Sequence, residues 1–140
     1  MSKAGFTGPR TGMTPAQLDT LQFLLRAGRV TELHHGDCLG SDAQAHSAAR
    51  VFPEIRIITH PPVNPACRAF CIADEEREPA EYIARDRDIV DETQYLIATP
   101  RSTTEEQRSG TWATIRYARS IGRPILRIWP DGFTDPENVS

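Results

Sequence analysis

Residues 95–132 read YLIATPRSTTEEQRSGTWATIRYARSIGRPILRIWPDG, and this stretch decides the predicted fold. It begins and ends with a compact apolar run, at residues 95–98 and 125–129, and a helical segment up to residue 121 lies between the two runs. Gly122 is expected to end that helix, as glycine commonly does. Apolar strands that alternate with helices are typical of a parallel sheet that is covered on both faces.

The same alternation extends toward the N-terminus. Further apolar runs predict strands at residues 3–7, 31–35 and 55–59. Helices are expected to start at three places, at Pro15 behind the N-cap Thr14, at Ser41 or Asp42, and at Ala80. The stretch between residues 61 and 79 is rich in proline and is expected to be a surface loop with one short helical turn.

These elements predict an α/β fold, namely a doubly wound, three-layer, Rossmann-like sandwich. Its sheet is expected to have five parallel strands in the order 3-2-1-4-5, with the strands numbered along the chain. A length of 140 residues fits a single domain, residues 1–140. The polar tail from about residue 133 is expected to be frayed.

Composition and charge exclude several classes of protein. The chain is 39% hydrophobic and 25% charged, which is ordinary for a folded protein. Its net charge of −3 disfavours a role in coating nucleic acid, because such proteins are usually strongly basic. The N-terminus does not read as a secretory signal, and no apolar run approaches the length of a membrane span. We therefore predict a cytoplasmic protein with no membrane partner.

The chain has three cysteines, Cys38, Cys67 and Cys71. An odd number argues against a disulfide framework. His60 precedes two of them, but the spacing is wrong for a zinc ribbon or finger. The sequence therefore predicts neither a metal site nor a bound cofactor.

Glycine, polar residues and arginine follow three of the predicted strands. The carboxyl ends of parallel strands meet at one edge, where ligands bind at the point at which the winding reverses. Glycine lets backbone N–H groups approach an anion, and a helix N-terminus favours negative charge. Any one of these turns alone is explained by ordinary turn chemistry, but together they favour a nucleotide-type site. The predicted ligand- and phosphate-binding residues are Gly8, Arg10, Gly36, Asp37, Gly40, Ser41, Arg85, Pro100, Arg108, Ser109, Gly110 and Thr111.

Several residues keep two interpretations. Asp42 is more simply a helix cap than a ligand, whereas Asp37 has no such structural role and is the better site candidate. Arg85 rather than Arg87 is expected to face the site. Trp112 stacks on a base or packs against the core or a neighbouring subunit. His34 and His35 are expected to be structural residues with hydrogen-bond partners inside the protein. For His60, a structural role and a place in the site are equally favoured.

Three motifs of the chain resemble those of the SLOG superfamily of Rossmann-like nucleotide-binding proteins. They are GDCLGSDA at residues 36–43, RDRDIV at residues 85–90 and RSGTWAT at residues 108–114. The resemblance covers about residues 3–132 and includes the LOG (lysine decarboxylase-like) and DprA-like groups. It implies the Rossmann-like fold, a small-molecule nucleotide or nucleoside phosphate as partner, and a homodimer or higher homo-oligomer. Trp112 and Tyr117 are expected to give the helix after residue 110 some exposed apolar character, which favours such an interface.

The resemblance also bears on catalysis. In the LOG phosphoribohydrolases a PGGxGTxxE motif binds phosphate and ends in a catalytic glutamate. The matching stretch here keeps Gly110 and Thr111 but has Thr114 where the glutamate stands. Threonine cannot act as a general base near neutral pH or stabilise an oxocarbenium-like centre by charge.

The sequence therefore favours a protein that binds a nucleotide or a nucleotide-derived small molecule as a sensor, carrier or sponge. The alternative is a nucleotide N-glycosidic hydrolase with a relocated carboxylate, for which Asp37 and Glu106 are the candidates. A DprA-like DNA-processing accessory is a second alternative, disfavoured by the negative charge. Whether the protein is an enzyme stays open at this point.

Overall fold

The apolar runs of the sequence form the centre of one sheet in the computed structural model, which describes residues 2–139. The five central strands are β3, β2, β1, β5 and β6, and all neighbours among them are parallel. The strands are β1 (Lys3–Thr7), β2 (Glu32–His35), β3 (Arg56–Thr59), β4 (Glu75–Glu76), β5 (Tyr95–Ala98), β6 (Ile125–Ile128) and β7 (Thr134–Glu137).

The sheet is larger than predicted. It has seven strands in the order β4-β3-β2-β1-β5-β6-β7, so the prediction of five strands in the order 3-2-1-4-5 is wrong as a description of the whole sheet. The two additional strands lie at its edges: β4 is parallel to β3, and β7 is antiparallel to β6. The tail from residue 133 is therefore not frayed, because it pairs with β6 and because Glu137 holds Arg119 and Arg127.

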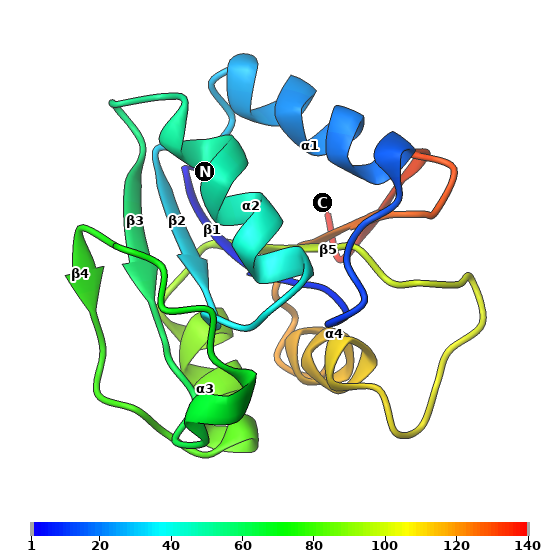
Figure 1. Cartoon of the computed structure of the whole chain (residues 1–140). Coiled ribbons are helices and arrows are strands. Elements are labelled where there is room, and N and C mark those ends of the chain that lie inside the picture. The colour runs from blue at the N-terminus through cyan, green and yellow to red at the C-terminus, as the bar shows by residue number, and fades with distance from the viewer. Residues whose placement is uncertain (1, 140) are drawn as a thin grey trace.

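Four helices cover the sheet, two on each face (Figure 1). Helices α1 and α2 pack against each other on one side, and α3 and α4 do so on the other. Their bounds are α1 (Pro15–Arg26), α2 (Ser41–Arg50), α3 (Tyr82–Asp91) and α4 (Gly110–Ser120). The predicted α/β three-layer sandwich with a mainly parallel sheet is therefore confirmed.

Alternate residues of the buried strands feed two apolar cores. Ile97 packs into the core on the side of α1 and α2, whereas Leu96 and Ala98 pack into the core beneath α4. This is the alternation expected of a strand that is buried on both faces. None of the helices within residues 2–139 has the length and apolar character that a membrane crossing needs.

The helix starts agree only in part with the sequence. Thr14 is the N-cap of α1, and its hydroxyl and the side chain of Gln17 form a capping box. The N-cap of α2 is Gly40, not Ser41 or Asp42, and it has a φ of +87°. The third helix begins at Tyr82, two residues later than the expected start at Ala80.

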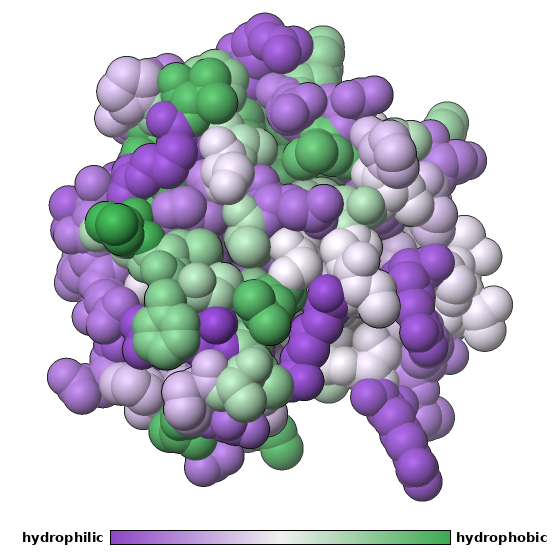
Figure 2. All heavy atoms as spheres, in the orientation of Figure 1, coloured by the Kyte–Doolittle hydropathy of each residue, from purple (hydrophilic) through white to green (hydrophobic). Residues whose placement is uncertain are grey.

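The segment between β3 and α3 contains the predicted helical turn, a 3-10 helix at Pro65–Cys67. It also forms the two-residue strand β4, which the sequence did not predict. Val63, Phe70 and Ile72 of this segment are exposed. Figure 2 shows hydrophobic residues interspersed with hydrophilic ones over this face of the molecule.

Candidate functional site

A cleft of about 620 Å³ lies where the first β-α turns and the starts of α3 and α4 converge. It is open at the carboxyl ends of the central strands, which is the edge that the sequence predicted. Its volume is within the usual range for small-molecule sites. The predicted site residues that line it are Gly8, Arg10, Gly36, Arg85, Arg108, Ser109, Gly110 and Thr111, together with Glu106.

One wall of the cleft is the start of α4. The Ser109 hydroxyl accepts a hydrogen bond from the Trp112 N–H, so it caps the helix. The N–H groups of Gly110 and Thr111 have no protein acceptor within residues 2–139. Arg108 is exposed and forms no ion pair with another described residue. This wall therefore presents free backbone donors and a free guanidinium to the cleft.

A second part of the cleft lining combines an aromatic ring with two arginines. The guanidinium carbons of Arg10 and Arg85 lie 5.3 and 5.2 Å from the centre of the Tyr82 ring. Arg10 also donates a hydrogen bond of 2.8 Å to the Tyr82 hydroxyl. The flat, positively charged surface suits an anionic ligand that carries a planar group.

Arg85 is held firmly at the base of the cleft. Its Nη1 donates to the Gly36 carbonyl oxygen at 2.7 Å and approaches the Cys38 sulfur at 3.1 Å. Burial alone would lower its pKa, but Asp86, Cys38 and Asp42 together raise it. Arg87 is exposed and lies over the Tyr117 ring on the outer side of α3. The expectation that Arg85 rather than Arg87 faces the cleft therefore agrees with their positions.

Two further carboxylates line the cleft, Asp42, for which the sequence favoured a helix cap over a ligand, and Asp86, which it did not single out. Burial raises the pKa of Asp42 to about 7, against the opposing effect of Arg85. Burial also raises the pKa of Asp86, against the opposing effects of Arg85 and the nearby Thr114, and its Oδ1 accepts a hydrogen bond of 3.1 Å from Nε of Arg85. Asp86 therefore lies beside the residue that replaces the glutamate of the LOG motif. The signal that would have pointed to it is its place next to Arg85 on the same helix.

Gly40 and Ser41 support the cleft from behind and do not line it. A Cβ on Gly40 would lie 2.1 Å from the Arg10 carbonyl oxygen, which no side chain allows. The Ser41 N–H and hydroxyl both donate to the Pro9 carbonyl oxygen, at 3.1 and 2.6 Å. These contacts fix the backbone that carries Arg10. Pro100 also lies outside the cleft, and its carbonyl oxygen accepts a hydrogen bond from Gln17.

Gly8 and Gly36 are needed for close packing at the floor of the cleft. A Cβ on Gly8 would lie 2.4 Å from the Thr99 hydroxyl oxygen, and a Cβ on Gly36 would lie 2.6 Å from Nη1 of Arg85. Gly110 differs, because a Cβ there would meet no atom within 4 Å. Its missing side chain leaves the start of α4 open.

The two candidate catalytic carboxylates of the sequence both have partners. Asp37 is fully buried outside the cleft, where it pairs with Arg68 and accepts a hydrogen bond from the Cys71 N–H. Glu106 lies on the rim, paired with Arg101 at 2.6 Å. Asp37 therefore has the structural role that the sequence did not reveal.

The remaining open residues do not line the cleft. Trp112 is buried in the core against Trp129, 6.2 Å between ring centres, and does not face the cleft. It thus contributes no exposed apolar surface to an oligomer interface, contrary to expectation. His34 and His35 are both hydrogen-bonded to a second histidine, and His60 is the partner of His34.

Comparison with solved structures identifies the fold. No protein-family model and no curated protein sequence matches the chain. The molybdenum cofactor binding protein from the phototrophic bacterium Rippkaea orientalis is similar with a TM-score of 0.70 at 20% identity, over 91% of this chain and 76% of that one. The Moco carrier protein from Chlamydomonas reinhardtii is similar with a TM-score of 0.65 at 20% identity, over 90% and 75% of the two chains. DNA processing protein A (DprA) from Streptococcus pneumoniae has a TM-score of 0.64 at 17% identity, over 91% of this chain and 50% of that one.

The chain shares its fold with these three proteins. The resemblance that the three sequence motifs indicated is therefore confirmed for the fold. All three motifs contribute residues to the lining of the cleft, and GDCLGSDA also supplies Gly40 and Ser41, which support it from behind. The fold thus brings together three segments that are far apart in the sequence.

Proposed function

We propose that the cleft binds a nucleotide or a nucleotide-derived small molecule and that the protein acts as a sensor, carrier or sponge for it. The observation that carries this proposal is the pair of free N–H groups at Gly110 and Thr111, with the unpaired Arg108 beside them. Backbone donors at a helix start, next to a guanidinium, are the chemistry that holds a phosphate.

The rest of the ligand lies against the wall formed by Arg10, Tyr82 and Arg85. A base or other planar group stacks well on guanidinium and aromatic surfaces. The buried Asp42 and the partly buried Asp86 also line the cleft, so their carboxyl groups are available to hydrogen-bond the rest of the ligand. An extended, phosphate-bearing ligand with one planar end therefore fits the cleft.

Two observations favour binding over hydrolysis. Thr114 stands where a LOG enzyme has its glutamate, and its hydroxyl is engaged with the Gly110 carbonyl oxygen at 2.9 Å. Two of the structural neighbours are, by name, a molybdenum cofactor binding protein and a Moco carrier protein. Both names describe binding rather than turnover, and they add the molybdenum cofactor to the ligands worth testing.

The phosphate site is tested by calorimetry with AMP, CMP, GMP and UMP. Gly110→Asp places a carboxylate where the phosphate is expected, so nucleotide binding should vanish. The fold should survive, because a side chain at Gly110 meets no atom within 4 Å of its Cβ. Gly110→Asn is the matched control, since it adds the same bulk without the charge and should keep more of the affinity. Unchanged affinity in Gly110→Asp would refute the site.

A second function, hydrolysis of a nucleotide N-glycosidic bond, is favoured by Asp86. This carboxylate lies in the cleft near Thr114, so it offers a negative charge close to where the LOG glutamate would be. Release of free base from a nucleoside monophosphate, lost in Asp86→Asn, would establish this function.

Assembly and location follow from the sequence alone. We keep the predictions of a cytoplasmic protein and of a homodimer, since closed two-fold symmetry is the commonest arrangement. Light scattering at micromolar concentration tests the dimer, and a strict monomer would contradict it.

A further inference from the structure

All four histidines of the chain lie in two hydrogen-bonded pairs on either side of β2. His34 and His35 are consecutive residues of this strand, so they point to opposite faces of the sheet. Nδ1 of His34 lies 2.8 Å from Nε2 of His60, and Nε2 of His35 lies 2.9 Å from Nδ1 of His46. Each pair has a third group nearby that is able to bind a metal, Glu92 for the first pair and Cys71 for the second.

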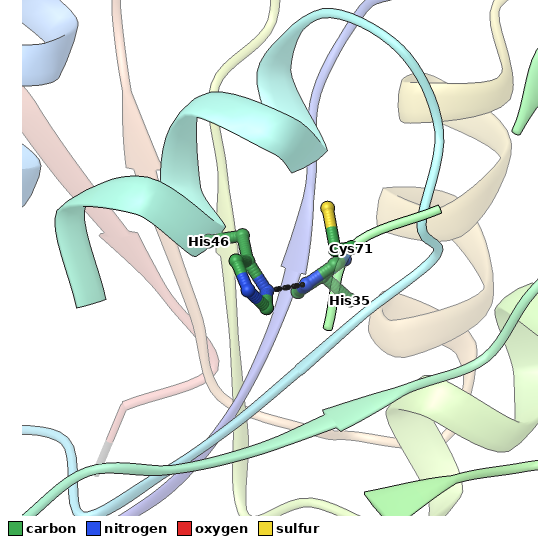
Figure 3. Close-up of side chains that lie close together, drawn as sticks. All are labelled: His35, His46 and Cys71. Carbon is green, nitrogen blue, oxygen red and sulfur yellow. Dashed lines mark hydrogen bonds between the residues drawn. The ribbon is translucent and has the colours of Figure 1, made fainter. Parts of the chain in front are cut away.

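The rings of His35 and His46 are hydrogen-bonded to each other, with the two nitrogens 2.9 Å apart (Figure 3). Nδ1 of His35 accepts a hydrogen bond of 3.0 Å from the Asp37 N–H, so the single proton of this neutral ring is on Nε2. That proton is donated to His46. A metal at Nε2 would force the proton onto Nδ1, where it would face the N–H of Asp37. The two rings beside Cys71 therefore already use the nitrogens that a metal would need, so this cluster is the weaker candidate for a metal site.

The pair of His34 and His60 has the opposite polarity. Nε2 of His34 lies 2.8 Å from a carboxylate oxygen of Glu32, which accepts its proton. Nδ1 of His34 is then left with a lone pair that faces His60. A carboxylate that holds the far N–H of a histidine, with the other nitrogen free, is the usual arrangement behind a metal-binding histidine.

Glu92 supplies a third ligand to the same point. One carboxylate oxygen of Glu92 and one nitrogen from each of His34 and His60 lie within 4.8 Å of one another. Arg77 donates with both Nε and Nη2 to Oε1 of Glu92, at 3.0 and 2.8 Å. Oε2 takes no part in the hydrogen bonds of the described residues, so Glu92 keeps one oxygen for a cation without losing Arg77.

We propose that His34, His60 and Glu92 form a binding site for a divalent transition metal, with zinc as the best match. Two imidazoles and one carboxylate are a common zinc ligand set that leaves a fourth position for water. Tetrahedral zinc holds its nitrogen ligands about 3.3 Å apart, so the two rings must separate by about 0.5 Å. The proton that His60 shares with His34 then moves to Nδ1 of His60, and both rings stay neutral.

The site has a route to solvent and a place in the fold. His34 and His60 are buried to 1% and 2% exposure, whereas the Glu92 side chain is 34% exposed, so Glu92 is the ligand that solvent reaches. The three ligands come from β2, from the residue after β3 and from the residue after α3. A bound metal would therefore join the C-terminal end of α3 to the sheet.

Calorimetric titration of the metal-free full chain with zinc chloride tests the proposal. We expect one site per chain, weakened tenfold or more in Glu92→Gln and abolished in His60→Ala. Glu92 is at the surface, so Glu92→Gln should fold normally and remains decisive if His60→Ala does not fold. Cobalt(II) gives a second readout, because a tetrahedral complex produces visible absorption bands that should be lost in Glu92→Gln.

The second histidine pair supplies matched controls. His46→Ala and Cys71→Ser alter the other cluster and should bind zinc as the unmodified chain does. The proposal is overturned if the chain shows no saturable zinc binding, or if Glu92→Gln binds as tightly as the unmodified chain. It is equally overturned if zinc binding is lost in His46→Ala or Cys71→Ser, which would assign the metal to the other face of the sheet.

Discussion

Arg68 Nε lies 2.7 Å from Oδ2 of Asp37, and this ion pair fastens the loop after β3 to the turn after β2. Asp37 is fully buried and Arg68 is largely so. The second oxygen of Asp37 accepts a hydrogen bond of 2.8 Å from the Cys71 N–H, so both oxygens hold the same loop. Asp37 therefore holds the loop after β3 in place next to the cleft.

Asp37→Asn should destabilise the protein and leave ligand affinity almost unchanged. Asparagine tolerates the positive φ of 53° and can still accept from Cys71, but it removes the charge that pairs with Nε of Arg68, which keeps Glu76 as its remaining partner. Because the Glu76 ion pair survives, the expected cost is about 1–3 kcal/mol, as for a buried donor that loses its acceptor. Urea unfolding measures the loss, with the exposed Asp19→Asn as control. If Asp37→Asn lost nucleotide binding but was as stable as the unmodified chain, Asp37 would be a ligand-binding residue instead.

Asp42→Asn should remove a pH dependence of stability. The pKa of Asp42 is raised to about 7 in the folded chain from an ordinary 3.8. Below pH 3.8 the group is protonated in both states, and it contributes nothing there. Between that pH and about 7 the unfolded chain ionises first, so the folded state loses stability as the pH rises.

The measurement is the free energy of unfolding of both proteins at several pH values. The advantage of Asp42→Asn over the unmodified chain should grow from pH 4 to pH 7, because the amide oxygen can still accept from the Cys38 N–H. A constant difference between the two proteins across this range would contradict the prediction.

Gly40→Ala should be far more destabilising than Gly28→Ala. Both glycines have a positive φ, +87° and +77° respectively. A Cβ on Gly28 meets nothing within 4 Å, so only backbone strain of about 1 kcal/mol is expected there. A Cβ on Gly40 would collide with the backbone of Arg10, so stability and ligand affinity should both fall. Thermal unfolding of the two variants gives the comparison. Equal melting temperatures would contradict the prediction, because they would show that the turn that carries Arg10 can move without loss of stability.

Nucleoside monophosphates should be bound without rapid cleavage to free base. Loss of one electrostatic group at a reacting centre commonly lowers a rate about a hundred- to a thousandfold. Chromatography of AMP, CMP, GMP and UMP after incubation measures the release of base. Robust turnover would make the protein an enzyme, and Asp86→Asn and Glu106→Gln would then identify the carboxylate. We expect Asp86 to be that group, because Glu106 is held at the rim by Arg101.

The centre of the fold was predictable because its signals are local. Apolar runs such as residues 95–98 identify the buried strands, and Thr14 with Pro15 identifies the start of α1. The edge strands have no such signal: β4 is two glutamates, and β7 reads TDPE. They form because the neighbouring strand offers free backbone groups and because arginines neutralise their carboxylates.

The site was predictable where topology alone places it. The residues that end strands or begin α4, such as Gly110, reach the cleft because parallel strands share one edge. Asp37 was misjudged because its partner Arg68 is 31 residues away in the sequence. Asp86 was missed because only its partial burial distinguishes it from the exposed carboxylates of the chain, and burial depends on contacts with distant segments.

The composition of the two edge strands limits how copies of this chain can associate. An open sheet edge is a template on which further strands can add, and proteins guard against this with short strands, charges and proline. At one edge β4 offers only two residues, both acidic, and at the other β7 carries Pro136 between two carboxylates. Growth of the sheet from chain to chain is therefore blocked at both ends. Any homo-oligomer must be built through helices or loops, and its subunits will keep separate sheets.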